Sequence, residues 1–149
     1  LESKLAYEGA FKPYFAYIAD CLKRFSSQRD KQKGEAYVHG FTLAMTSQCK
    51  FYRPISELDN DGGYADIFLR PLLENYPDKD IEDSYIVELK YCKPGTSDEQ
   101  LNHLFEEASA QIRRYANSDI VHKSVKTTKL HQLVVIYRGA EMAMCEEVE

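Results

Sequence analysis

The chain has 149 residues, of which 44% are hydrophobic and 29% charged, and its formal net charge is −5. These values are typical of one globular domain with its own core, and they argue against a nonspecific coat on nucleic acid, which requires positive potential. No segment approaches the ~18 consecutive apolar residues of a membrane span, and no secretory signal opens the chain, so we expect no membrane partner.

The first third of the chain predicts helices. Apolar residues recur at helical spacing between residues 5 and 25, and Pro13 suits the first turn of a helix that begins near residue 11. A second helix is expected over about 34–48, with Glu35 in its first turn, where the helix dipole favours a carboxylate. Its expected buried stripe consists of Tyr37, Phe41, Ala44 and Met45, with Val38 beside it.

The middle of the chain predicts three strands. Residues 51–58 form the first, and Pro54 within it indicates an edge strand or a bulge. The run 59–63, Asp-Asn-Asp-Gly-Gly, is a strong turn signal before a second strand over 64–72. A third strand is expected over 84–92. This order predicts an antiparallel meander.

The last third predicts a helix and two strands. Ser97 is a suitable N-cap for a helix that runs to about residue 117. Its core-facing residues are expected to be Leu101, Leu104, Phe105, Ala108, Ile112 and Tyr115. Residues 133–137 then read as a buried strand, and 142–148 as an edge strand after a turn at Gly139.

Asp66, Glu88 and Lys90 are the most informative polar residues. Side chains alternate along a strand, so Glu88 and Lys90 point to one face, and Asp66 can lie beside them if the two strands pair. Two carboxylates and an ammonium group can hold a divalent cation and activate water for phosphodiester hydrolysis. The competing interpretation is a solvated strand face. The apolar neighbours of Glu88 favour a central strand, where a buried Glu and Lys require partners.

Gln111 and Tyr115 lie four residues apart on the helix after this strand and therefore share a face. They either line the mouth of the site, touching phosphate or substrate, or form ordinary surface and core positions. The histidines His39, His103, His122 and His131 have no HxxxH partner, which favours structural or surface roles.

The four cysteines are widely spaced and contain no CxxC pair, which indicates free thiols in a reducing cytoplasm rather than a zinc site. The chain starts at Leu1, without a methionine and inside a helical pattern. We therefore expect a fragment or an excised domain of a longer protein.

The order of these elements resembles the PD-(D/E)XK nuclease superfamily. The segments 35–41, 63–67, 85–91 and 111–115 are more specifically similar to the C-terminal nuclease-like domain of bacterial AAA-ATPase-like proteins common in Bacteroidetes. The resemblance implies an α/β fold with a restriction-endonuclease-like αβββαβ core, a mixed sheet of four or more strands flanked by helices. Residues 34–149 would form this domain. Residues 1–33 would be a helical lead-in from an absent upstream ATPase-like domain.

The resemblance also implies roles for individual residues. Asp66 and Glu88 would be metal ligands, Lys90 the catalytic lysine and Glu35 an auxiliary metal ligand. Gln111 and Tyr115 would contact substrate, and nearby cations such as Arg113 or Arg114 would meet phosphate. Ala65 stands where the family name has proline, and Gly63-Tyr64-Ala65-Asp66 lacks the arginine that relatives often carry after the glycine.

The resulting expectation is a nuclease that depends on Mg²⁺ or Mn²⁺ and acts on nucleic acid, with DNA as the expected substrate. The alternative is a catalytically inactive nuclease fold that binds nucleic acid or regulates an attached ATPase-like domain. A third reading, a plain scaffold with surface charges, predicts that Glu88 and Lys90 face solvent. The oligomeric state stays open, a homodimer included.

Overall fold

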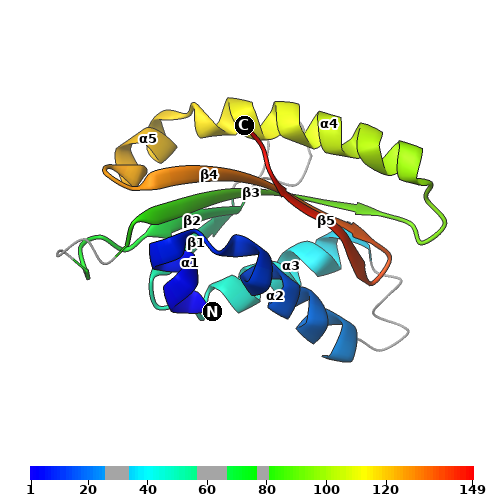
Figure 1. Cartoon of the computed structure of the whole chain (residues 1–149), viewed down its shortest axis with the longest axis horizontal. Helices are drawn as coiled ribbons and strands as arrows, with labels where there is room; N and C mark the ends of the chain where they lie inside the picture. Colours follow the sequence, from blue (N-terminus) through cyan, green and yellow to red (C-terminus); the bar gives the residue numbers. More distant parts are fainter. Residues whose placement is uncertain (26–33, 57–66, 77–80) are drawn as a thin grey trace.

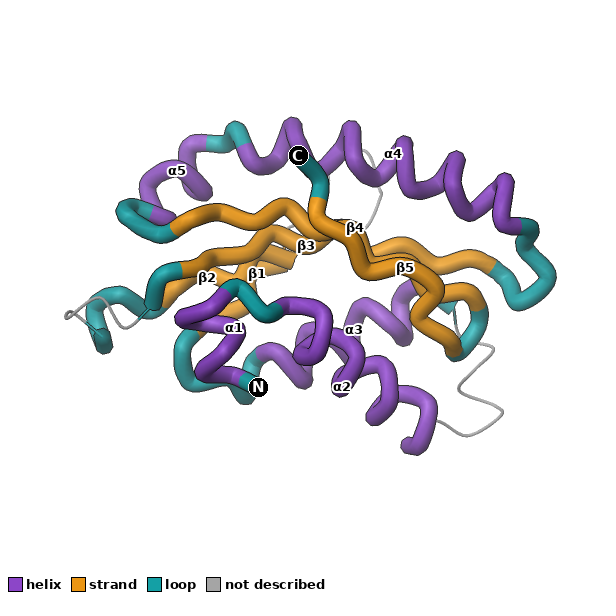
Figure 2. The backbone as a smooth tube through the Cα atoms, in the orientation of Figure 1, coloured by secondary structure: helices purple, strands orange, loops and turns teal. Residues whose placement is uncertain are grey.

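A computed structural model describes residues 1–25, 34–56, 67–76 and 81–149. These residues form three layers, with one sheet between two sets of helices (Figures 1 and 2). Asp66 and the turn expected at 59–63 lie outside the described residues.

The central layer is a five-stranded mixed sheet in which spatial order follows chain order. The strands are β1 (Tyr52–Ser56), β2 (Ile67–Pro71), β3 (Asp83–Cys92), β4 (Lys129–Arg138) and β5 (Glu141–Glu147). β1, β2 and β3 pair antiparallel, which confirms the predicted meander, and Pro54 does lie on an edge strand. β3 and β4 pair in parallel, and β5 returns antiparallel to β4.

One face of the sheet is covered by α1 (Glu2–Glu8), α2 (Phe11–Phe25) and α3 (Glu35–Thr46) (Figure 1). Their apolar side chains share one buried cluster with the odd-numbered residues of β3 and β4. That cluster includes Leu5, Phe15, Ile18, Leu22, Val38, Tyr85, Val87, Leu89, Leu133 and Val135. The N-terminal helices therefore pack on the same core as the sheet, and the domain boundary expected at residue 33 stays a prediction.

The stripe predicted for α3 is wrong in part. Ala44 is exposed, and the positions buried along α3 are Val38, His39, Thr42 and Thr46. Both threonine hydroxyls donate to the carbonyl four residues earlier, at 2.8 and 2.9 Å, so their burial leaves no hydroxyl unsatisfied. Hydrophobicity alone does not predict that these threonines are buried, because their hydroxyls are hydrogen-bonded within their own helix.

The other face is covered by α4 (Asp98–Ala116) and α5 (Asp119–Val125). Ser97 and Gln100 form a capping box at the start of α4, which confirms the predicted helix start. Leu101, Ala108 and Ile112 of α4 are buried in the second cluster, with Phe68, Ile86, Val134 and Ile136 of the sheet. Parallel strands require a long crossover connection, and α4 forms most of the one between β3 and β4.

The expected αβββαβ core is confirmed as α3, β1, β2, β3, α4 and β4. The helical pattern expected up to residue 25 is divided at Gly9 into α1 and α2, and α5 was not predicted. All four cysteines are free, and three of them, Cys21, Cys49 and Cys145, are buried. Within the described residues, no helix combines the length and the apolar character that crossing a membrane would require.

Candidate active site

Glu88 and Lys90 form a buried ion pair on β3. The Lys90 Nζ lies 3.2 Å from Glu88 Oε1, and the two side chains are 19% and 4% exposed. The prediction that they share a face is confirmed. The burial of Glu88 contradicts the scaffold reading, which requires both side chains to face solvent. A carboxylate buried this deeply is costly unless charged or hydrogen-bonding groups compensate it.

The position of β3 explains why this pair is enclosed. β3 is central, and its neighbours Ile86, Val87 and Leu89 are each at most 3% exposed. Glu88 and Lys90 point to the face covered by α4, since they alternate with Val87 and Leu89, which belong to the opposite cluster.

Glu35 approaches the pair from the first turn of α3. A side chain placed at Gly34, which precedes it, would lie 3.7 Å from the Tyr91 ring, so the start of α3 lies beside the end of β3. Burial raises the pKa of the Glu35 carboxyl, while the charges of Lys90 and then His39 oppose that shift. Lys90 and His39 are therefore each within electrostatic reach of Glu35.

His39, for which the sequence favoured a structural or surface role, lies near this site. It lies one helical turn after Glu35 and is buried, and its Nε2 is 3.2 Å from the Ser56 hydroxyl at the end of β1. The contact ties α3 to the sheet. The available signal was the spacing of four residues from Glu35, which places both on one helix face.

Asp66, the second predicted metal ligand, lies outside the described residues. Within residues 1–25, 34–56, 67–76 and 81–149, no group of three or more His, Cys, Asp or Glu side chains is arranged to hold a metal ion. The described acids near Lys90 are Glu88 and Glu35. Carboxylate oxygens of this kind are the donors that Mg²⁺ and Mn²⁺ prefer, so the donor set fits such an ion in chemical type.

The substrate residues expected on α4 are divided between two sides of the helix. Gln111 and Tyr115 are half-buried on one flank, and the Tyr115 hydroxyl oxygen is inaccessible to solvent. Arg113 donates to the Glu149 carbonyl at 3.1 Å on the opposite flank, toward β5, and Arg114 is exposed. Within the described part of the chain, no hydrogen bond or ion pair joins Gln111 or Arg114 to Glu88 or Lys90.

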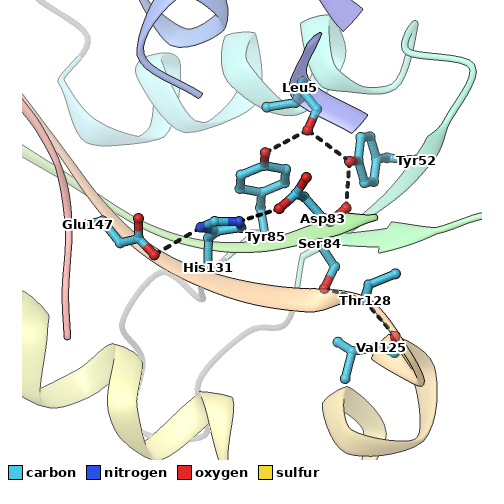
Figure 3. Close-up of polar contacts among 9 residues, drawn as sticks. All are labelled: Leu5, Tyr52, Asp83, Ser84, Tyr85, Val125, Thr128, His131 and Glu147. Carbon is cyan, nitrogen blue, oxygen red and sulfur yellow. Dashed lines mark hydrogen bonds and ion pairs between the residues drawn. The ribbon is translucent and has the colours of Figure 1, made fainter. Parts of the chain in front are cut away.

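A second buried polar cluster, which the sequence did not reveal, lies on the opposite face (Figure 3). His131 sits between two acids, with Nε2 2.7 Å from Asp83 Oδ1 and Nδ1 2.9 Å from Glu147 Oε2. The His131 ring stacks on the Tyr85 ring, with 4.9 Å between the two ring centroids. The partners are 48 and 16 residues away in the chain, so no local motif could have predicted them.

Tyrosines close this cluster. The Tyr85 hydroxyl donates to the Leu5 carbonyl at 2.6 Å, and the Tyr52 hydroxyl donates to the Asp83 carbonyl at 2.6 Å. With both ring nitrogens of His131 occupied by acids of the protein, the cluster joins α1, β1, β3, β4 and β5 and has a structural role.

A model of the PD-(D/E)XK nuclease superfamily matches residues 33–147. The match covers most of the chain, including β3 with Glu88 and Lys90. No curated protein and no solved structure matches. The family match and the mixed sheet, with an acid and a lysine two residues apart on its central strand, lead to one conclusion: the chain belongs to the PD-(D/E)XK nuclease superfamily.

Proposed function

We propose that this protein hydrolyses phosphodiester bonds of nucleic acid, with DNA as substrate, at a site built from Asp66, Glu88 and Lys90. The observation that carries the proposal is the buried ion pair of Glu88 and Lys90 on the central strand of a nuclease-superfamily fold. In the reaction, water attacks phosphorus, one P–O bond breaks, and the products are a phosphate monoester and a hydroxyl.

The proposed metal ligands are Asp66 and Glu88, with Glu35 completing the set directly or through water. Asp66 is bonded to Ile67, whose Cα pairs with that of Val87, the residue before Glu88. This register supports the assignment of Asp66. A bound Mg²⁺ or Mn²⁺ would shield the negative charge on the phosphate and lower the pKa of a coordinated water.

Lys90 is proposed to hold the attacking water. Its ammonium group has three donors, and the bond to Glu88 at 3.2 Å uses one of them. Because the side chain is 19% exposed, a water at the surface of the site can accept another. Gln111 and Tyr115 are proposed to contact the substrate from α4, and Arg114 to meet a phosphate.

A second candidate function is a module that binds nucleic acid, or regulates an attached ATPase-like domain, without cleavage. The net charge of −5 and the absence of an arginine in Gly63-Tyr64-Ala65-Asp66 favour it. The Glu88–Lys90 pair favours catalysis. In either case we propose the context suggested by the resemblance: a nuclease-like domain over 34–149 that follows an ATPase-like domain in a cytoplasmic bacterial protein.

Metal binding and cleavage test the proposal together. We expect calorimetric titration to detect binding of Mg²⁺ or Mn²⁺, and we expect plasmid or single-stranded DNA to be cleaved in that metal. Lys90→Ala should abolish cleavage, while Lys93→Ala, which removes an exposed lysine just after the same strand, should not.

Each of the other outcomes would reject one part of the proposed function. No heat with either ion would reject the metal site. Equal cleavage by Lys90→Ala would assign the activity to a contaminant or to another site. Binding of DNA without cleavage in any metal would establish the second candidate.

A further inference from the structure

Two arginines face each other at the edge of the sheet. Arg53 of β1 and Arg70 of β2 are paired in register. Like charges directly opposite each other on neighbouring strands are unfavourable. Glu74 binds Arg70 at 3.0 Å and compensates one of the two charges. Arg53 is exposed, and within the described residues it makes no ion pair.

These arginines lie on the same face of the sheet as Glu88 and Lys90. Ile55 and Phe68 pack in the cluster that contains Ile86, on the α4 side. Arg53 is two residues from Ile55, and Arg70 is two residues from Phe68. Both arginine side chains therefore point to the α4 side of the sheet.

Lys126 adds a third cation to this edge. It is exposed, follows α5 directly and has the unusual backbone angle φ of 47°. α5 packs against β2. A backbone hydrogen bond lowers the pKa of the Glu74 carboxyl, and Arg70 and then Lys126 lower it further. Lys126 is therefore within electrostatic reach of Glu74, so Arg70 and Lys126 share this one acid, and Arg53 lies across from Arg70 on the neighbouring strand.

The cations of the opposite helix layer are arranged differently. Lys12 and Lys23 of α2 pair with Glu146 and Glu141 of β5, and Arg24 pairs with Asp20. Among the described residues of a chain with net charge −5, Arg53 and Lys126 at the edge of β1 and β2 are therefore exposed cations that form no ion pair, whereas Lys12, Lys23 and Arg24 of α2 are paired with acids.

The distance from this edge to the candidate active site suits a nucleic-acid strand. Leu69 pairs with Tyr85, so Arg70 lies about four residues of strand, or ~13 Å, from the level of Glu88. That length corresponds to about four nucleotide steps of a B-form strand. Gln111 and Tyr115 lie on the α4 flank that faces away from β5, and thus toward β1 and β2.

We propose that Arg53, Arg70 and Lys126 form a phosphate-binding edge along which the backbone of the nucleic acid runs to the Glu88–Lys90 site. This surface rests on the proposed function for its orientation toward that site, and its binding can be measured independently of cleavage.

The test measures the affinity of metal-free protein for a fluorescein-labelled DNA duplex and for the matching single strand, over a range of salt. The double variant Arg53→Gln/Lys126→Gln should bind about tenfold more weakly, and its log K against log salt slope should be shallower by about two for the duplex. Arg53→Glu should weaken binding further. The control Lys4→Gln/Lys12→Gln removes two exposed cations from the α1–α2 layer and should bind as wild type does.

The outcomes separate this surface from the proposed catalysis. Wild-type affinity and slope in the Arg53 and Lys126 variants would overturn the surface, even if the protein cleaves DNA. An equal loss in the Lys4/Lys12 control would overturn it as well, since the effect would then be general charge. If wild type binds neither DNA, the surface is rejected. Weaker binding of the edge variants by a protein that never cleaves would support the surface and reject the nuclease.

Discussion

The buried polar side chains on the two faces of the sheet differ in how far the protein itself satisfies them. On the face that α1 to α3 cover, His131 of β4 has an acid at each ring nitrogen, at 2.7 and 2.9 Å, and a tyrosine stacked on its ring. On the α4 face, Lys90 contacts Glu88 at 3.2 Å and stays 19% exposed.

The difference supports the proposal that the His131 cluster is structural and that Glu88 and Lys90 take part in the reaction. A polar network whose donors and acceptors are used within the protein holds elements together and offers little to a ligand. An ammonium group that keeps donors near solvent, next to a buried carboxylate, is poised to interact with something outside the chain. Substitutions should therefore affect stability in the His131 cluster and activity at Glu88 and Lys90.

The largest effect should come from Glu88→Gln. We expect a loss of cleavage of at least about 10³-fold, which corresponds to about 4 kcal/mol of transition-state stabilisation, because a neutral amide is a poor ligand for a hard cation. The shape of the side chain is kept, so the midpoint of urea unfolding should change little. Cleavage rates and unfolding curves of the same preparation check this. Comparable activity in the variant would remove Glu88 from the reaction.

His131→Ala should show the reverse pattern. It leaves the Asp83 carboxylate, 11% exposed, without its imidazole partner, and the expected loss of unfolding free energy is about 3 kcal/mol. Glu147, at 36% exposed, should contribute less, because solvent can reach it. Denaturant unfolding measures the loss, and metal titration of the folded variant should match wild type. A stable variant that no longer binds metal would reverse the two roles.

Tyr85→Phe is a milder change in the same structural cluster. Burial raises the pKa of the Tyr85 hydroxyl, so it stays protonated and donates to the Leu5 carbonyl at 2.6 Å. Its removal should cost about 1 kcal/mol of unfolding free energy. The Glu82 backbone amide donates to the Ala6 carbonyl of α1 at 2.8 Å, and its hydrogen exchange should be faster in the variant; unchanged or slower exchange would contradict a role in anchoring α1.

Glu35→Gln should have the smallest effect on stability, with a definite pH dependence. The pKa of Glu35 is raised above its ordinary value of 4.5, first by burial, so the folded state binds a proton more tightly than the unfolded state. The carboxyl then contributes stability at pH below 4.5, and this is lost as pH rises through the raised pKa. The half-buried position limits the effect to less than about 1 kcal/mol.

The Glu35 prediction is checked by unfolding wild type and Glu35→Gln across this pH range. Wild-type stability should fall relative to the variant as pH rises, so Glu35→Gln should be slightly the more stable protein near neutral pH. Parallel pH profiles for the two proteins would show that Glu35 is not desolvated.

The regular elements and the chemical residues of β3 followed from local pattern. The helical spacing of Phe15, Ile18 and Leu22 predicted α2, Ser97 predicted the start of α4, and the alternation around Val87 predicted that Glu88 and Lys90 share a face. Each of these depends on residues close in the chain, where helix and strand periods determine direction.

Contacts between distant segments could not be read in this way. The acids of His131, the charge of Lys90 acting on Glu35, and the arginine pair of β1 and β2 are set by strand order and register. The sequence by itself determined the elements and the identity of the acid and lysine on the central strand, because these depend on local periodicity. Only the tertiary structure decided which charges are enclosed and which face outward, because burial depends on the packing of elements far apart in the chain.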